Sequence, residues 1–191
     1  MQPSGGRATL EVAVVIVVVY LVQSSLSIFG VGIGLFALSM PLETYPWTII
    51  TAVYAHAGPS HLLANLIGIL VFGFIVERRT TRLRFHAFVL LSGVIAAIAE
   101  VTVGALVGTS VMVLGISGAV FALMGYVATS NPVSNTILNR LEVDWRVQLA
   151  LFLLVAVVLT YVTAGERVAL VAHFVGLILG LLAGRIHLLR V

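Results

Sequence analysis

The sequence predicts an all-α membrane protein, a bundle of six transmembrane helices with a short central fourth helix. Three observations favour this fold class: the composition, the length of the apolar segments and the placement of arginine. Of the 191 residues, 61% are hydrophobic and 9% are charged, and the mean hydropathy is +1.19. A water-soluble domain of this size carries far more charge on its surface. We therefore expect the chain to fold within a lipid bilayer.

Six apolar segments are the candidate spans, because a helix of about 20 apolar residues crosses the hydrocarbon core. They are Leu10–Phe29, Ser60–Val76, Phe85–Leu106, Gly115–Thr129, Val147–Tyr161 and Val168–Leu188. The first is too long for the apolar part of a signal peptide, and no clean small-residue cleavage site follows it, so we predict a retained helix. There is no internal repeat and no linker-like stretch, so residues 1–191 are predicted to form a single domain.

The segment between the first two predicted spans, Gly30–Pro59, is too apolar for a free loop. It contains a single charged residue, Glu43. We expect this segment to lie in the outer interface of the membrane, where Tyr45 and Trp47 suit a position among the lipid headgroups.

Arginine is distributed unevenly over the predicted loops. In a six-helix arrangement one side carries nine arginines, namely Arg7, Arg78, Arg79, Arg82, Arg84, Arg140, Arg146, Arg185 and Arg190. Only Arg167 falls on the other side. Since cytoplasmic loops are enriched in basic residues, we predict a multi-pass protein of the cell membrane with both termini in the cytoplasm. A count of five or seven helices would destroy this asymmetry.

The composition also excludes several classes of partner. The net charge of +3 comes from scattered arginines, which provide too little basic surface for a nucleic-acid site. The chain has no cysteine, so disulfides and thiolate metal sites are excluded. We expect no cofactor, no metal and no nucleic acid; the predicted surroundings are the lipid bilayer.

Four polar side chains on three helices are predicted at similar depths in the membrane. At about 1.5 Å of rise per residue, Ser117, His173, Asn65 and His61 lie about 21, 18, 18 and 24 Å from the cytoplasmic ends of their helices. In a hydrocarbon core about 30 Å thick, they share a layer roughly 10 Å below the outer surface. Polar side chains at that depth are costly and usually mark a functional site.

The predicted fourth span is a shortened helix, and its N-terminus lies at the depth of these polar side chains. Only 14 residues separate Ser117 from Asn131 at its inner end, so the helix does not reach the outer face. We expect a water-filled depression above its N-terminus, lined by irregular backbone over Gly108–Gly115. The unpaired N–H groups and the positive dipole end of that N-terminus suit an oxyanion.

Ser117 is the candidate nucleophile, placed between Gly115 and Gly118. The alternative is structural, because a serine in a spanning helix often bonds to a backbone carbonyl or permits close packing. Phe121, four residues later on the same face, is placed to pack against the ring of His173, or else it is ordinary packing.

His173 is the candidate general base. It is followed by Gly176, Gly180 and Gly184, whose spacing makes one smooth face for close contact with the fourth span. This contact would bring the imidazole towards Ser117, where it can accept the hydroxyl proton. A histidine satisfied by a backbone carbonyl is the alternative.

His61 and Asn65 share one helical face and can donate hydrogen bonds to a developing negative charge. Interhelical hydrogen bonding without catalysis is the alternative. Together with His173, His56 and His61 raise the question of zinc, but their spacing is not that of zincins and no Glu adjoins them, so no metal is predicted. Glu100 is interpreted as an anchor for the neighbouring outer loop and is not included in the site.

The joint pattern of these residues resembles the rhomboid family of intramembrane serine proteases. His56, His61 and Asn65 resemble the family's second-helix pattern of His, four residues, His, three residues, Asn. The segment Gly115–Phe121 resembles its Gly-x-Ser-Gly motif and the following helix start. The other matching segments are Val76–Arg79 and Ala172–Gly180, and the resemblance covers about Trp47 to Gly184. A lone Gly-x-Ser-Gly would be weak, whereas the ordered set is highly specific.

The resemblance implies a Ser–His dyad without a third acid. Ser117 would be the nucleophile and His173 the base and acid, while His61, Asn65 and the Ser117 backbone N–H would hold the oxyanion. The supporting residues implied by the resemblance are Gly115, Gly118, Phe121 and His56.

Two departures from the family pattern lie outside the dyad. Trp47 is followed by Thr48, where the family often has arginine, so the role of that arginine is in doubt here. Phe121 stands where the family often has tyrosine, so it can stack but cannot donate a hydrogen bond.

The predicted function is therefore a serine endopeptidase that cleaves single-span membrane proteins near the outer face of the membrane. One alternative is a catalytically inactive rhomboid-like protein that binds or regulates membrane proteins. Another is a small transporter or channel, but this needs a polar path to the cytoplasm, and the lower halves of the second, fourth and sixth spans are too apolar for one.

Overall fold

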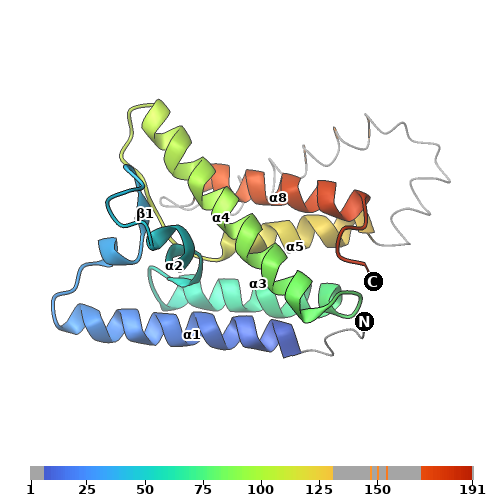
Figure 1. The fold of residues 1–191 in the computed structure, drawn as a ribbon, viewed down its shortest axis with the longest axis horizontal. Coiled ribbons are helices and arrows are strands. Elements are labelled where there is room, and N and C mark those ends of the chain that lie inside the picture. Colours follow the sequence, from blue (N-terminus) through green and yellow to red (C-terminus); the bar gives the residue numbers. More distant parts are fainter. Residues whose placement is uncertain (1–6, 131–146, 148–149, 151–153, 155–168, 191) are drawn as a thin grey trace.

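A computed structural model describes residues 7–130 and 169–190, together with the single positions 147, 150 and 154. Most of the predicted helix 147–161 lies outside the described residues, as do the loop arginines Arg140, Arg146 and Arg167. The count of six spans therefore stays a prediction. Figure 1 shows that the described part is a bundle of helices with a short helix and a small sheet at one end.

Three helices are long and apolar enough to cross a membrane, judged by length and composition. They are α1 (Arg7–Ile28), α3 (Pro59–Glu77) and α4 (Arg82–Leu106). Two shorter apolar helices follow, α5 (Ser117–Ser130) and α8 (Leu170–Arg185). Each corresponds to a predicted span with its ends shifted by a few residues.

Local sequence explains several of these helix ends. Pro59 begins α3, where its missing N–H and fixed φ cost nothing. Thr81 caps α4 by accepting a hydrogen bond from the Arg84 amide. After α4 ends, Gly108 has a φ of +74°, the left-handed conformation that commonly terminates helices.

The segment between α1 and α3 contains structure that the sequence did not predict: the 3-10 helix η1 (Ile33–Leu35), strand β1 (Leu38–Ser39) and helix α2 (Thr48–Tyr54). The stretch expected to be irregular, Gly108–Gly115, contains strand β2 (Met112–Val113).

Strands β1 and β2 pair antiparallel, with Leu38 opposite Val113 and Ser39 opposite Met112. The expectation of a wholly irregular stretch was thus wrong at these two residues. Strands this short carry no alternating pattern, and they form only because tertiary packing places them side by side.

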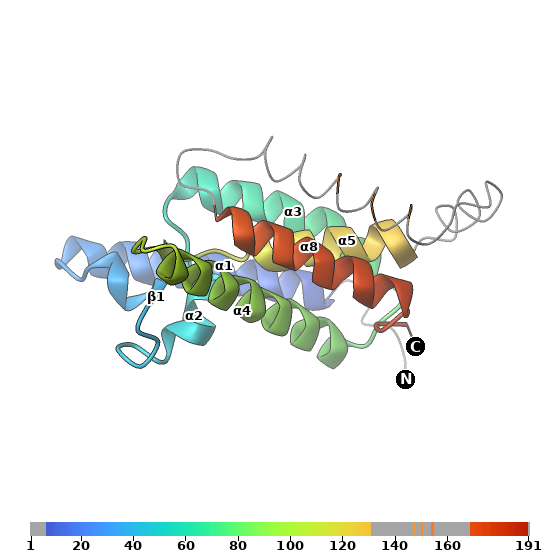
Figure 2. The same cartoon turned by 90° about the horizontal axis from the view of Figure 1, so that it is seen from above.

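The arginines of the described chain gather at one end of the bundle. Figures 1 and 2 show that α1 and α4 begin at the same end at which α3 and α8 finish. The described arginines lie at or next to these helix ends: Arg7, Arg78, Arg79, Arg82, Arg84, Arg185 and Arg190. Helix α2 and the β1–β2 sheet lie at the opposite end (Figure 1).

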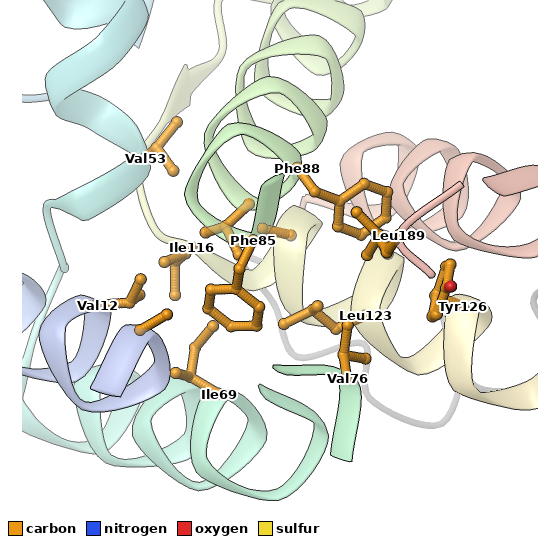
Figure 3. Close-up of a cluster of buried hydrophobic side chains, with 14 of the residues drawn as sticks. Val12, Val53, Ile69, Val76, Phe85, Phe88, Ile116, Leu123, Tyr126 and Leu189 are labelled. Carbon is orange, nitrogen blue, oxygen red and sulfur yellow. The ribbon is translucent and has the colours of Figure 1, made fainter. Parts of the chain in front are cut away.

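A buried apolar cluster joins the helices at their centre (Figure 3). Phe85 of α4, Ile69 of α3 and Leu123 of α5 are fully buried in it. Ile116 is also fully buried, so the residue before Ser117 is anchored in the core.

Helices α5 and α8 pack with almost no space between their backbones. A Cβ added at Gly176 would overlap the Gly118 carbonyl, and one added at Gly180 would overlap the Ala122 carbonyl. At the far end of the contact, Thr129 donates a hydrogen bond of 3.0 Å to the Leu181 carbonyl across the two helices. The predicted glycine face on α8 is thus confirmed, and α5 is its partner.

Candidate active site

The structure brings Ser117 and His173 together. Ser117 is the first residue of α5, and His173 lies in the first turn of α8. The Ser117 Oγ is 2.9 Å from the His173 Nε2, within hydrogen-bonding distance. His173 is only 7% exposed, whereas Ser117 is partly exposed, so the imidazole is buried and the serine is not fully enclosed. The tight glycine contact between the two helices places the hydroxyl and the imidazole at the same level.

Phe121 holds the imidazole from one face. The rings of Phe121 and His173 are stacked, with centroids 4.3 Å apart and planes inclined by 18°. Offset stacking of aromatic rings is favourable, and it restricts rotation of the histidine. The packing that the sequence suggested for Phe121 is therefore present.

His61 and Asn65 lie close to the backbone that leads into Ser117. A Cβ built on Gly115 would be 2.7 Å from Cε1 and 2.9 Å from Nε2 of His61, and 3.7 Å from Nδ2 of Asn65. Gly115 also has a φ of +123°, which disfavours any other residue. The glycine thus gives the two donor side chains access to the start of α5.

The loop around Gly115 is fixed by hydrogen bonds to neighbouring elements. Its amide donates to the Ala52 carbonyl of α2 at 2.8 Å. On α3, the Asn65 Nδ2 donates to the His61 carbonyl at 3.1 Å, which leaves its second amide hydrogen free to meet another acceptor.

His56 lies just before α3 and is fully buried. Its Nδ1 is 3.1 Å from the Tyr54 carbonyl, and its ring meets that of His61 edge-on with centroids 5.2 Å apart. Burial, and secondarily the neighbouring His61, lower the pKa of His56 to about 4, so the ring is neutral near neutral pH. His56 therefore supports His61 as a neutral neighbour.

Gln23 of α1 is a site-supporting residue that we did not identify from the sequence. Its side-chain amide donates to the His56 carbonyl at 2.8 Å and accepts from the His56 amide at 3.2 Å. The available signal was a polar side chain within an apolar span, now seen to be 8% exposed.

Glu100 of α4 accepts a hydrogen bond of 2.8 Å from the Ala172 amide, one residue before His173. The carboxylate therefore caps the N-terminus of α8, where a negative charge is favourable. It was expected to anchor the neighbouring outer loop, and the structure shows that it holds the helix start which carries the imidazole.

Within the described residues, no group of three histidine, aspartate or glutamate side chains is arranged to hold a metal ion. His56 and His61 adjoin each other, but their rings meet edge to face.

A serine hydroxyl and an imidazole are thus paired where two helices of an apolar bundle begin. The Rhomboid domain family model matches residues 43–190. The chain therefore belongs to the rhomboid family, and it is a multi-pass membrane protein.

Three similar proteins are from Arabidopsis thaliana. RHOMBOID-like protein 5 is 29% identical over 150 residues, which cover 75% of this chain and 45% of that protein. RHOMBOID-like protein 6, mitochondrial, is 34% identical over 79 residues, covering 41% of this chain and 24% of that protein. RHOMBOID-like protein 1 is 25% identical over 150 residues, covering 75% and 35%. The matches thus span less than half the length of these relatives.

Proposed function

We propose that the protein is an intramembrane serine endopeptidase with Ser117 as nucleophile and His173 as general base. The observation that carries this proposal is the 2.9 Å separation of the Ser117 Oγ and the His173 Nε2. Hydroxyl and imidazole within this distance are the minimal parts of an activated serine nucleophile. Membership of the rhomboid family supports the same assignment.

In the proposed reaction, the Ser117 Oγ attacks the carbonyl carbon of the scissile peptide bond while the His173 Nε2 accepts the hydroxyl proton. The tetrahedral intermediate then expels the amine, which takes that proton from Nε2, and an acyl-enzyme ester remains. A water molecule, deprotonated by the same imidazole, attacks the ester, and the second tetrahedral intermediate expels the Ser117 Oγ. The serine oxygen takes the proton back from Nε2, which releases the carboxylic acid and restores the enzyme. For Nε2 to act as base, the neutral ring carries its own proton on Nδ1.

No third acid is required by this scheme. Within the described part of the chain, the buried His173 Nδ1 has no hydrogen-bond partner. Stacking on Phe121 and the Glu100 cap at the start of α8 are the interactions that orient the imidazole instead.

We assign the oxyanion to donors from two elements. The Ser117 backbone N–H lies at the start of α5, where amides have no partner within the helix. His61 and Asn65 reach the same loop from α3, as their distances to Gly115 indicate. Donors held in place before the reaction stabilise the developing charge without reorganisation.

The proposed substrates are single-span membrane proteins, cut near the outer face of the cell membrane. The arginine-rich end of the bundle is assigned to the cytoplasm, together with both termini, by the positive-inside rule. Ser117 begins its helix at the far side from that end, so water and substrate approach from the outer side. A substrate helix must unwind to expose a peptide bond, which favours small or helix-breaking residues at the cut.

The test is cleavage of a transmembrane substrate in liposomes by wild type, Ser117→Ala and Ser27→Ala. Removing a nucleophile reduces turnover by at least about 10³-fold, so Ser117→Ala is expected to be inactive. The matched control removes an exposed serine near the end of α1, whose hydroxyl bonds only to the Ser24 carbonyl, and it keeps full activity.

Labelling by a serine-directed fluorophosphonate separates this proposal from an inactive rhomboid-like protein that binds membrane partners. The wild type is expected to be labelled and Ser117→Ala is not. A folded wild type that resists labelling and leaves every substrate intact would instead favour the binding role.

A further inference from the structure

We propose that the arginine-rich end of the bundle carries a binding site for the phosphate group of an anionic phospholipid. The site lies at the opposite end of α5 from Ser117, next to Ser130. It rests on the geometry of that end alone and does not depend on the proposed protease activity.

A cavity of about 180 Å³ lies where α3 and α5 end and the chain continues beyond α8. This volume is several times the roughly 30 Å³ that one water molecule occupies in the liquid, so it admits a phosphate group. Its polar lining is Arg78, Arg79, Tyr126, Ser130 and Arg190.

Two of the three arginines are available to a ligand. The side chains of Arg78 and Arg79 form no ion pair or hydrogen bond within the described residues, where the ion pairs are those of Glu11 with Arg82 and His86. The neighbouring Glu77 carboxylate is directed to α1, where it accepts the Thr9 amide at 2.6 Å. Guanidinium groups match phosphate oxygens in geometry as well as charge.

Arg190 is held in position at the edge of the cavity. Its guanidinium donates to the Ser130 carbonyl at the end of α5, and its own carbonyl accepts from Arg84 at 3.0 Å. The guanidinium thus offsets the negative end of the α5 dipole, which would otherwise repel an anion.

Tyr126 is a further indication, independent of the arginines, that a polar ligand binds in the cavity. It lines the cavity and is 4% exposed, and its hydroxyl makes no hydrogen bond of good geometry within the described part of the chain, where the Ser130 side chain and the Leu189 backbone are polar groups near it. The Tyr126 ring packs against Phe88 with centroids 6.0 Å apart, and both residues belong to the apolar cluster drawn in Figure 3. A buried hydroxyl without a partner is costly, and a phosphate oxygen in the cavity would satisfy it.

A lipid matches the walls better than free phosphate does. The apolar part of the cavity lining is Ile75, which is 47% exposed, Val76 and Val127. A phosphate that carries acyl chains can contact both the arginines and this apolar wall, whereas inorganic phosphate contacts only the arginines. Basic pockets between helices at the cytoplasmic membrane surface suit anionic lipid headgroups.

The experiment follows thermal unfolding of the purified full chain in detergent micelles as phosphatidylglycerol, phosphatidylcholine or inorganic phosphate is added. A ligand that binds the folded state raises the unfolding midpoint in a saturable manner. Wild type is compared with Tyr126→Phe, Arg79→Gln and the control Arg185→Gln, which removes an exposed arginine in the last turn of α8 outside the cavity.

We expect saturable stabilisation by phosphatidylglycerol alone. Loss of one hydrogen bond to a charged group weakens binding by about 10-fold or more, so Tyr126→Phe and Arg79→Gln are expected to bind that much less tightly. Arg185→Gln is expected to bind like wild type. Without lipid, Tyr126→Phe is expected to unfold no earlier than wild type, because the hydroxyl it loses makes no hydrogen bond of good geometry within the described residues.

Four results would overturn the proposal. Equal stabilisation by phosphatidylcholine would show that no anion is selected, and equal stabilisation by inorganic phosphate would show that the lipid is not the ligand. Equal lipid affinity in all variants would place the binding elsewhere. A lower lipid-free midpoint for Tyr126→Phe would show that its hydroxyl bonds to the protein.

Discussion

At the scale of single residues, the site depends on one position that has no functional group. Gly115 combines a φ of +123° with close approach to the imidazole of His61, so both its backbone and its missing side chain are needed. The proposed oxyanion donors lie on α3 and the nucleophile on α5, and this glycine is the point at which they meet.

The oxyanion assignment predicts that His61→Ala and Asn65→Ala each lower kcat by about 10²–10³-fold. The developing negative charge loses a donor in each case, whereas the substrate has not yet gained that charge when it binds. KM is therefore expected to change little. Steady-state cleavage of a transmembrane substrate measures both constants.

A matched control for this prediction is Ser27→Ala at the exposed end of α1. Both site variants must also unfold at the same temperature as wild type. If KM rises while kcat stays unchanged, the two side chains stabilise the bound substrate and the transition state equally. They would then not be oxyanion donors.

At the scale of helices, the closeness of α5 and α8 determines the geometry of the proposed dyad. Their glycines permit contacts between backbones, and Glu100 of α4 caps α8 immediately before His173. The imidazole therefore depends on three helices for its position. Closely packed small residues replace the hydrophobic effect as the source of helix association in a membrane.

We predict that Gly180→Ala separates α5 from α8, because its Cβ would overlap the Ala122 carbonyl. Overpacking typically costs about 1–3 kcal/mol, and displacement of His173 from Ser117 would also lower kcat. Thermal unfolding and fluorophosphonate labelling rates report the two effects separately.

Gly34→Ala is the matched control, since a Cβ there meets nothing within 4 Å. It is expected to leave the labelling rate unchanged. If Gly180→Ala is as stable and as reactive as Gly34→Ala, the backbone contact between α5 and α8 does not position the dyad.

At the scale of the whole molecule, the two ends of the bundle differ in charge and in structure. The described arginines gather at one end, and α2 with the β1–β2 sheet lies at the other. Exposed apolar side chains cover the helices between them, including Leu63, Ile67 and Val71 of α3. This distribution matches a bilayer, with lipid around the middle and water at the two ends.

The proposed orientation can be tested because the chain has no cysteine. Single cysteines at the exposed positions Thr44, between β1 and α2, and Arg185, at the end of α8, lie at opposite ends of the bundle. In intact cells, a membrane-impermeant maleimide is expected to label Thr44→Cys. Arg185→Cys is expected to react only after permeabilisation, and the reverse pattern would contradict a cytoplasmic arginine end.

The sequence by itself determined the helical class, the approximate limits of α1, α3, α4, α5 and α8, and the candidates Ser117 and His173. Each of these follows from a local property: a long apolar run, a glycine spacing or a polar residue at an unusual depth. Most of the predicted span 147–161 lies outside the described residues, so the structure does not test it.

Only the tertiary structure decided which distant groups meet. The Gln23–His56 and Glu100–Ala172 hydrogen bonds join residues 33 and 72 positions apart, and β1 pairs with β2 although three helices separate them in the chain. No local pattern encodes such contacts, because each depends on how several helices pack against one another. The 2.9 Å between hydroxyl and imidazole has the same origin, in the glycine contact that brings two helix backbones together.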